Sequence, residues 1–422
     1  MTATEASGPI SAAPDPRETR VVAIVFVTVF LDLVGFGIII PFLPLYVKSM
    51  GGTAATVGFL FASFSLTQVI ATPILGRLSD RFGRRRVILL SLAGNAASMA
   101  LFALAADTRF LPLLFFSRIL AGATAGNIAA CQAAVADVTQ GSSRARGMGR
   151  IGAGIGLGMV LGPMIGSSAS KLGPSFPPLA AAALAALDLV AAFFLMPETR
   201  AFGTPAVPGS GPYRTDPTPR AASLEALLSE PRIALTLALY FLTFLCITPL
   251  QVALPLLASA RLHWGEADIG RVFGLFGVIG LIVQGFLIGR MTRAFGARNL
   301  VIAGAFASMV GLALVAAAHT SPALIGGLSF LALGLGVTNP VLSTLASEYA
   351  GAERQGLVLG YAQSAGGIAR TVGPVGWGYL YDFIGPGAPF VGAAIAAFGA
   401  FVIAIGARAA ARAGVAGKTN RA

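Results

Sequence analysis

The sequence predicts an all-α integral membrane protein whose helices form two bundles of six. Three observations carry this prediction. Hydrophobic residues make up 56% of the 422 residues and charged residues only 11%, whereas about 25% of an ordinary soluble domain is charged. Apolar runs long enough to cross a bilayer, roughly 20 residues each, recur along the chain. The second half of the chain also repeats features of the first. This composition excludes a soluble domain, a disordered chain and a collagen-like fibre.

The chain begins with a polar, proline-containing tail at residues 1–20, which we expect to be cytoplasmic. The apolar run from Val21 is too long for the core of a signal peptide, so it is predicted to be the first span. An N-terminal six-helix bundle is then expected at residues 21–196. Its predicted spans are Val21–Val47, Thr56–Leu75, Val87–Ala106, Leu111–Ala136, Gly147–Ala169 and Pro178–Met196.

Residues 197–231 are rich in proline and charge, and they are predicted to be a cytoplasmic linker. A C-terminal six-helix bundle is expected at residues 232–408, followed by a cytoplasmic tail at residues 409–422. The predicted spans of this bundle are Ile233–Leu257, Ile269–Ile288, Leu300–Ala318, Ala323–Leu345, Leu357–Tyr381 and Gly387–Ala407.

Three short stretches of the first bundle recur in the second at nearly one spacing. Leu43-Pro44-Leu45 matches Leu254-Pro255-Leu256, Gly76–Gly83 matches Gly289–Gly296, and Gly162-Pro163 matches Gly373-Pro374. This repetition predicts a duplicated unit with pseudo-two-fold symmetry. Transporters built in this way bind their substrate between the two repeats, so a central cavity is expected.

The net charge of +12 reflects the membrane topology and not a nucleic-acid partner. Arginines crowd alternate connections and the C-terminal tail, and under the positive-inside rule these segments are cytoplasmic. The rule therefore places both termini and the linker in the cytoplasm. The two cysteines and two histidines are too few and too scattered for a disulfide framework or a metal site.

The connection after the second span carries the strongest motif, Gly76-Arg-Leu-Ser-Asp80-Arg81-Phe-Gly83-Arg84-Arg85-Arg86-Val-Ile88. It resembles the G-x-L-a-D-r-x-G-r-R-x-x-I pattern of the major facilitator superfamily. The resemblance extends over nearly the whole chain and implies that superfamily's fold. It also implies that this loop gates the cytoplasmic side, through Gly76, Asp80, Arg81, Gly83, Arg84 and Arg85. The alternative is that these arginines only set the topology.

Glycines recur every four residues in the fifth span, which reads Gly149-(eight)-Gly158-(three)-Gly162-Pro163-(two)-Gly166. The spacing is similar to the motif of the family's exporters. It leaves one flat helix face for close packing, and we expect the eleventh span to be its partner. The alternative is generic packing of small residues.

The first span contains Asp32-x-x-Gly-x-Gly-x-x-x-Pro-x-x-Pro, which is similar to the tetracycline-exporter-like drug:proton antiporters. An ionised carboxylate in an apolar span is costly unless it is protonated, paired or wet. The resemblance assigns proton coupling to Asp32 and to Arg118 of the fourth span, and we expect these two residues to be partners. The alternatives are a permanently paired structural carboxylate and an arginine that only ties helices together.

Other polar residues in the spans have weaker assignments. Asp188 of the sixth span is expected to have a structural or minor role. Arg370 of the eleventh could contact an anionic group or pair with an acid. The ninth span has no acidic residue, in contrast to the family's tetracycline pumps, which argues against tetracycline itself as the substrate. Possible cavity residues are Gln68, Asn127, Gln132, Gln251, Gln284, Asn339, Gln363 and Arg370.

The resemblance implies a secondary transporter that exports a small amphiphilic drug or metabolite in exchange for protons by alternating access. It implies no enzymatic activity and no cofactor, because the proton gradient supplies the energy. The expected setting is a bacterial-type inner membrane, with a small-molecule substrate, protons and the lipid bilayer as partners and a monomeric chain. The alternatives are a proton-coupled importer of a small metabolite and a non-transporting receptor on the same fold.

Overall fold

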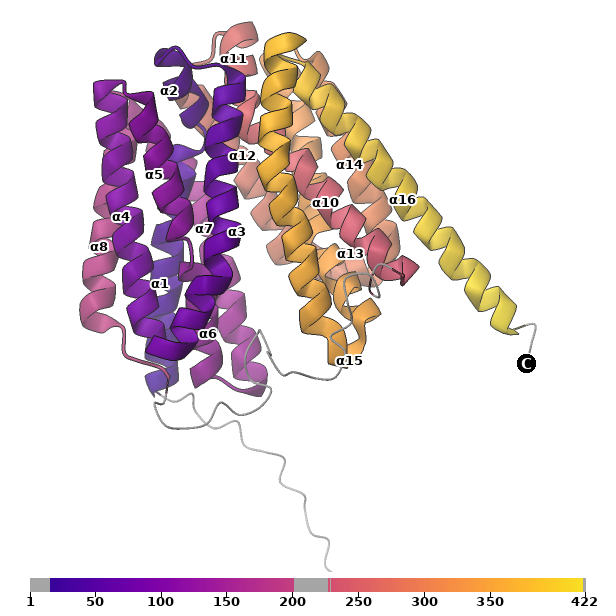
Figure 1. The fold of residues 1–422 in the computed structure, drawn as a ribbon. Helices are drawn as coiled ribbons and strands as arrows, with labels where there is room; N and C mark the ends of the chain where they lie inside the picture. The colour runs from indigo at the N-terminus through magenta and orange to yellow at the C-terminus, as the bar shows by residue number, and fades with distance from the viewer. Residues whose placement is uncertain (1–15, 201–226, 228, 420–422) are drawn as a thin grey trace, which may run out of the picture.

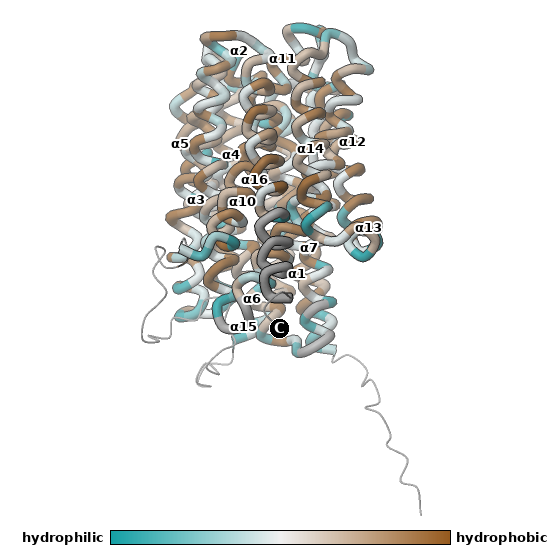
Figure 2. The backbone as a smooth tube through the Cα atoms, turned by 90° about the vertical axis from the view of Figure 1, so that its right-hand side faces the viewer, coloured by the Kyte–Doolittle hydropathy of each residue, from teal (hydrophilic) through white to brown (hydrophobic). Residues whose placement is uncertain are grey.

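The computed structural model describes residues 16–200, 227 and 229–419 (Figure 1). The first part of the predicted N-terminal tail, most of the linker and the last three residues lie outside the described residues. Every element in the described part is a helix, and eleven helices are long and apolar enough to cross a membrane. The hydrophobic residues of the tube in Figure 2 gather between its two more hydrophilic ends, as a bilayer requires.

Eight helices form the N-terminal bundle and the remaining described helices form the C-terminal bundle. The first set is α1 (Pro16–Ile39), α2 (Leu43–Ser49), α3 (Ala54–Phe82), α4 (Arg84–Thr108), α5 (Leu111–Ala123), α6 (Asn127–Val138), α7 (Gly141–Ser170) and α8 (Phe176–Leu195). The second set is α10 (Pro231–Val252), α11 (Leu254–Leu262), α12 (Glu266–Ile282), the π-helix η1 (Val283–Leu287), α13 (Ile288–Phe295), α14 (Ala297–Ala317), α15 (Ser321–Phe383) and α16 (Ala388–Thr419).

Corresponding spans of the two bundles break at the same proline motif. The first predicted span divides into α1 and α2, and the seventh divides into α10 and α11. Pro44 and Pro255 each lie in the first turn of the short second helix. Proline suits that position because its missing N–H needs no partner there. The repeated Leu-Pro-Leu sequence therefore builds the same bend in both bundles.

The tenth and eleventh predicted spans are one helical segment, α15, of 63 residues. A straight helix of that length would measure about 95 Å. Both of its ends nevertheless lie near α2 and α11, because Ser321 accepts a hydrogen bond from Trp264 and Asp382 contacts the start of α3. The segment therefore reverses direction and supplies two antiparallel arms (Figure 1). The predicted tenth and eleventh spans are thus joined by helix between Leu345 and Leu357. The eleven spanning helices include the first arm, Ser321–Ala350, but not the less hydrophobic second arm, which holds the predicted eleventh span.

Two helix pairs make most of the contacts between the bundles, α3 with α15 and α7 with α12, and smaller contacts join α2 with α11 and α3 with α10. Their polar contacts lie at the end of the molecule that carries α2 and α11, which we call the α2/α11 end. Asp382 of α15 accepts hydrogen bonds from the backbone N of Ala54 and Ala55 of α3, at 3.0 and 2.8 Å. Ser167 of α7 donates to the carbonyl of Ala267 of α12 at 3.2 Å. The bundles are therefore closed against each other at this end.

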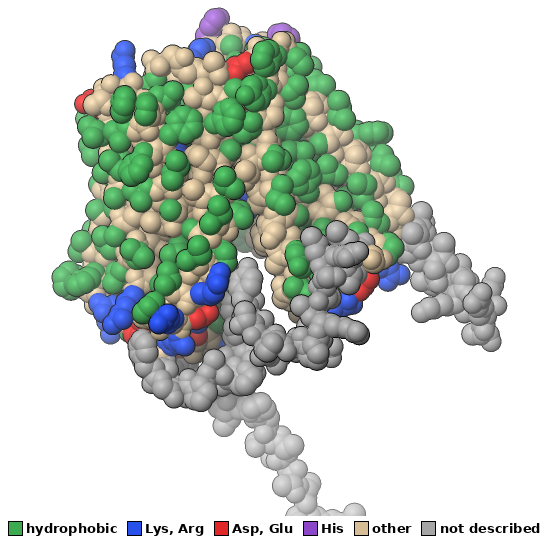
Figure 3. Space-filling view, in the orientation of Figure 1, with side chains coloured by type: hydrophobic (Ala, Val, Ile, Leu, Met, Phe, Trp, Pro, Cys, Tyr) green, Lys and Arg blue, Asp and Glu red, His purple; other side chains and the backbone are tan. Residues whose placement is uncertain are grey.

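The other end of the molecule carries the arginines of the α3–α4 connection and of α13, and we call it the arginine-rich end. Lys and Arg side chains gather there in the space-filling view, and the molecule is hollowed between the two bundles above them (Figure 3). The conformation is thus open toward the arginine-rich end and closed at the α2/α11 end.

Candidate functional site

The connection between α3 and α4 is organised by Arg84, one of the predicted gating residues. Its Nη1 lies 2.5 Å from Asp80 Oδ1, and its Nε lies 3.0 Å from Asp137 Oδ2. Asp137 stands at the end of α6, so this contact ties the connection to a third helix. The Asp80 side chain is 61% exposed and that of Arg84 only 11%. Arg84 is therefore the buried centre of this loop, and Asp80 is its exposed partner.

Glu198 lies against the start of α4, beside Gly83. Its carboxylate accepts a hydrogen bond from the backbone N of Arg84 at 2.9 Å, where the helix dipole favours a negative charge. Gly83 has a φ of 102°, and a side chain on it would collide with the Glu198 carboxylate. The positive φ favours glycine at this position, and a larger residue would also displace the Glu198 side chain. Sequence reasoning missed Asp137 and Glu198, because they lie far from the motif in sequence and reach it only through the fold.

The other predicted gating residues lie at the surface of this loop. The Arg81 guanidinium stands 5.2 Å from the ring centre of Phe82, and Arg85 donates to the carbonyl of Phe193 of α8 at 2.6 Å. Gly76 has open space where a side chain would stand. For the part of the chain described, the hydrogen bonds and ion pairs of this loop all stay within the N-terminal bundle. That confinement is consistent with an open arginine-rich end.

The glycine face of α7 packs against α1. A side chain at Gly158 would strike Leu33, one at Gly162 would strike Gly37, and one at Gly166 would strike Phe42. Pro163 also lies beside Gly37. The expected partner, the eleventh span, is therefore wrong. Gly149 has open space around it and takes no part in this contact.

The glycines of the eleventh span pack in the corresponding way within the C-terminal bundle. Gly366 lies against Phe244 and Gly373 against Thr248, both on α10. The neighbouring Pro374 packs on Gly58 of α3. In each bundle, one glycine-rich helix thus packs against the first helix, α7 on α1 and α15 on α10. The same glycine-rich helix also contacts the other bundle. This is the pseudo-two-fold relation that the repeated Gly-Pro sequence predicts.

Two carboxyl groups, Asp32 and Asp188, lie together inside the N-terminal bundle. Asn95 donates from Nδ2 to Asp32 Oδ1 at 2.7 Å, and Asn127, whose Nδ2 has no hydrogen-bond partner, lies near the same carboxyl group. Thr28 lies beside Asp188, which is close enough to Asp32 to interact with it electrostatically. We call this group, which includes Cys131 beside both acids, the carboxyl cluster; its members are Thr28, Asp32, Asn95, Asn127, Cys131 and Asp188.

The two acids of the carboxyl cluster differ in exposure. Asp188 is 1% exposed, and its Oδ2 has no hydrogen-bond partner. Asp32 is only partly buried, so part of its surface is accessible from outside the protein. In the described residues neither carboxyl has an ion pair. The expected minor role of Asp188 rested on its sequence position, which gave no sign that α8 brings it to Asp32.

Arg118 does not reach Asp32. This residue of α5 is 4% exposed, and its Nη2 lies 3.8 Å from Met99 Sδ. Its guanidinium carbon stands 4.9 Å from the ring centre of Phe102. The expected pair of Asp32 with Arg118 is thus absent from this conformation.

Arg370 has a similar environment in the C-terminal bundle. Its guanidinium carbon stands 4.7 Å from the ring centre of Phe244, and it has no carboxylate partner among the residues described. A ring face attracts a cation less strongly than a carboxylate does. Each bundle therefore holds one arginine in its spans that is free to pair with an anionic group.

The predicted cavity residues are scattered. Asn127 belongs to the carboxyl cluster, where its Oδ1 accepts from Cys131 Sγ at 3.3 Å. Gln132, Gln284 and Gln363 are exposed, whereas Gln68, Gln251 and Asn339 are half-buried. Gln284 lies in the π-helix η1. Burial alone gives these amides no common site.

Comparisons with known proteins agree with this architecture. The model of the Major Facilitator Superfamily matches residues 25–287 and 236–421. The class E tetracycline resistance protein of Escherichia coli is 32% identical over 366 residues, which cover 86% of this chain and 88% of that protein. Multidrug resistance protein 2 of Bacillus subtilis is 27% identical over 87% of this chain and 90% of that protein. The crystal structure of the human organic anion transporter MFSD10 superposes with a TM-score of 0.67 at 28% identity, covering 92% of this chain and all of that one.

Proposed function

This chain belongs to the major facilitator superfamily as a transporter of the drug:proton antiporter type, and we propose that its proton binds at Asp32 and Asp188. Asp32 is the outer group of the pair, because it alone is accessible, and Asp188 is the inner one. The observation that carries the proposal is the proximity of two acids inside one bundle, neither of which has an ion pair among the described residues.

The physical argument concerns the charge that such a pair can hold. Two neighbouring carboxylates inside a protein oppose double ionisation, because each disfavours the charge of the other. The hydrogen bond from Asn95 stabilises one negative charge on Asp32, and the polar side chains of Asn127 and Thr28 lie near the pair. A site of this kind can take up and release a proton without breaking an ion pair.

Arg118 enters the proposal as a separate positive charge of the same bundle. It is buried and has no carboxylate partner in the described part of the chain, which is costly unless some state of the transport cycle supplies one. We assign that partner to Asp32 after a shift of α5 against α1, or to an anionic group of the substrate. Arg370 serves as the corresponding charge in the C-terminal bundle.

The transported compound is proposed to be a small amphiphilic drug or metabolite. The tetracycline and multidrug resistance proteins among the relatives support this class, and the apolar spans with scattered amides suit it. The arginine-rich end is proposed to face the cytoplasm of a bacterial-type cell, so the described conformation would be open to the inside. The monomer is the proposed unit, and the proton gradient replaces any cofactor.

Inverted membrane vesicles test the proposal. A susceptibility panel that includes tetracycline first selects a transported compound in a host without its own pumps. ATP hydrolysis then acidifies the vesicle lumen, and uptake of that compound is followed. One proton moved through 100 mV is worth about 2.3 kcal/mol, which sustains about fiftyfold accumulation.

The variant Asp32→Asn should lose this proton-driven accumulation. Asp107→Asn is the matched control, because it removes an exposed acid from the same bundle, and it should behave like the unchanged protein. Accumulation by Asp32→Asn with an unaltered dependence on the proton gradient would refute the role of Asp32.

A further inference from the structure

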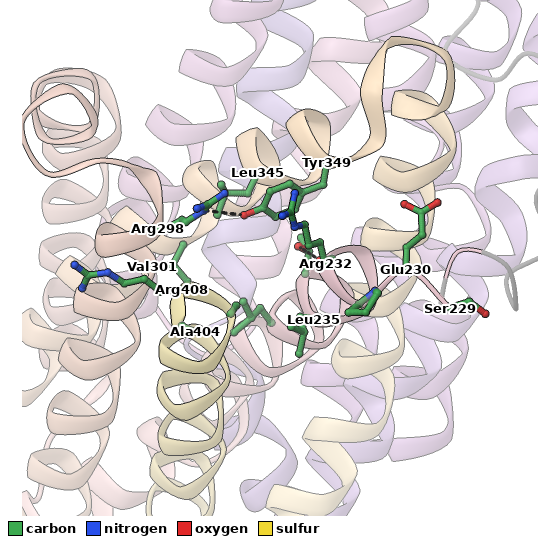
Figure 4. Close-up of a pocket in the computed structure, with 14 residues that line it drawn as sticks. Ser229, Glu230, Arg232, Leu235, Arg298, Val301, Leu345, Tyr349, Ala404 and Arg408 are labelled. Atoms are coloured by element: carbon green, nitrogen blue, oxygen red, sulfur yellow. Dashed lines mark hydrogen bonds between the residues drawn. The ribbon is translucent and has the colours of Figure 1, made fainter. Parts of the chain in front are cut away.

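A cavity of about 380 Å³ lies in the C-terminal bundle at the arginine-rich end (Figure 4). No residue of the carboxyl cluster lines it. Four helices, α10, α14, α15 and α16, contribute to it. None of the amides predicted to line a cavity belongs to it. Its apolar walls come from Leu235, Leu239, Val301, Leu345, Ala404 and Ala407.

Three arginines from three helices also line this cavity: Arg232 of α10, Arg298 of α14 and Arg408 of α16. Arg298 Nε lies 3.2 Å from the hydroxyl of Tyr349, and Figure 4 shows Arg232 close to the same ring. In the described part of the chain, none of the three arginines has a carboxylate partner.

The one acid that lines the cavity is already paired. Glu230 Oε1 lies 2.5 Å from Arg354 Nη1, and Figure 4 shows its carboxylate turned away from Arg232 and Arg298. Arg232 and Arg298 stand in the first turns of α10 and α14, so the N-termini of these helices also lie at the cavity. A helix N-terminus carries a partial positive charge. The cavity is therefore apolar inside, with uncompensated positive charge at its edge.

We infer that this cavity binds an acidic phospholipid. The phosphate lies at Arg232, Arg298 and Arg408, and the part of an acyl chain nearest the head group packs against the apolar wall. Charge complementarity supports an anionic head group. The location supports a lipid, because Arg232 and Arg298 stand at the starts of two apolar spans and Arg408 at the end of a third. Basic pockets between transmembrane helices at the cytoplasmic surface bind anionic head groups. A small soluble anion would make no favourable contact with the apolar wall.

Native mass spectrometry of the purified full chain tests the inference with phosphatidylglycerol and phosphatidylcholine of the same acyl chains. Phosphatidylglycerol should bind at least about tenfold more tightly. Each of Arg232→Gln, Arg298→Gln and Arg408→Gln should weaken its binding about fivefold, because one arginine near a lipid surface contributes about 1 kcal/mol. The matched control is Arg290→Gln with Arg293→Gln. These two exposed arginines of α13 hydrogen-bond only carbonyls of their own turn, and their loss should leave binding unchanged.

Two further measurements identify the ligand. Ala407→Phe should fill the cavity and weaken phospholipid binding while all charges remain. Inorganic phosphate should fail to displace the bound lipid. Equal binding of both lipids, an equal loss in the α13 control, or displacement by phosphate would overturn the inference. Unfolding temperatures identify variants that fail to fold, and in that case Arg298→Lys, which keeps the charge, should retain more binding than Arg298→Gln. Transport plays no part in these measurements, so their outcome is independent of the proton site.

Discussion

At the scale of single residues, Asp188 decides whether proton binding involves one acid or two. It lies beside Asp32, fully buried and with one oxygen unpartnered. Asp188→Asn keeps the shape of the side chain but cannot ionise. We expect transport to continue with fewer protons released per substrate, measured with a pH-sensitive dye in inverted vesicles. A purely structural Asp188 predicts an unchanged proton count, and Asp107→Asn supplies the control for the loss of an acid.

The sequence identifies the acids of the carboxyl cluster but not their grouping. Asp32 and Asp188 stand out because an ionisable residue in an apolar run needs a reason. Their proximity follows from the packing of α1 on α8, which connects residues far apart in the chain. No local pattern encodes that packing. The expected partnership of Asp32 with Arg118 failed for the same reason, since opposite charge alone does not determine which helices meet.

At the scale of helices, the contact between α1 and α7 depends on the absence of side chains from α7. The Cα of Gly37 would stand 2.7 Å from a Cβ on Gly162. Gly162→Ala should therefore force the helices apart and destabilise the protein by about 1–3 kcal/mol. Gly149→Ala is the matched control, because its Cβ would meet open space. Thermal unfolding in detergent should show a lower midpoint for the first variant alone, and equal midpoints would disprove close packing at Gly162.

The sequence predicts helices well where a physical rule is local and poorly where it is not. Hydropathy locates the spans, and Pro44 and Pro255 explain the bends in α1–α2 and α10–α11. The reversal inside α15 carries no proline or glycine pair that would mark it as a loop. The glycine spacing in α7 correctly indicates a flat face, yet it cannot say which helix covers that face.

At the scale of the whole molecule, the orientation in the membrane follows from the arginine-rich end. Cys131 and Cys246 are both buried, so the unchanged protein should react little with a membrane-impermeant maleimide. Ala294→Cys, exposed at the arginine-rich end, should react only in inverted vesicles. Leu172→Cys, 68% exposed in the connection after α7, should react in intact cells. Reaction of Ala294→Cys in intact cells, with reaction of Leu172→Cys only in inverted vesicles, would contradict the proposed orientation and direction of transport.

The equilibrium between the two open states depends on the contacts that close the α2/α11 end, and Asp382 supplies a charged one. Its carboxylate accepts two hydrogen bonds from the N-terminus of α3 in the other bundle, and a hydrogen bond to a charged group is worth about 1.5–3 kcal/mol. Asp382→Asn should therefore shift the population about tenfold or more toward opening at this end. Spin labels at Lys48 and His319, exposed at this end on different bundles, should report a larger share of long distances. Asp268→Asn is the control, because that acid pairs within its own helix with Arg271. If both variants leave the distances unchanged, the apolar contacts between α3 and α15 hold this end closed without help from Asp382.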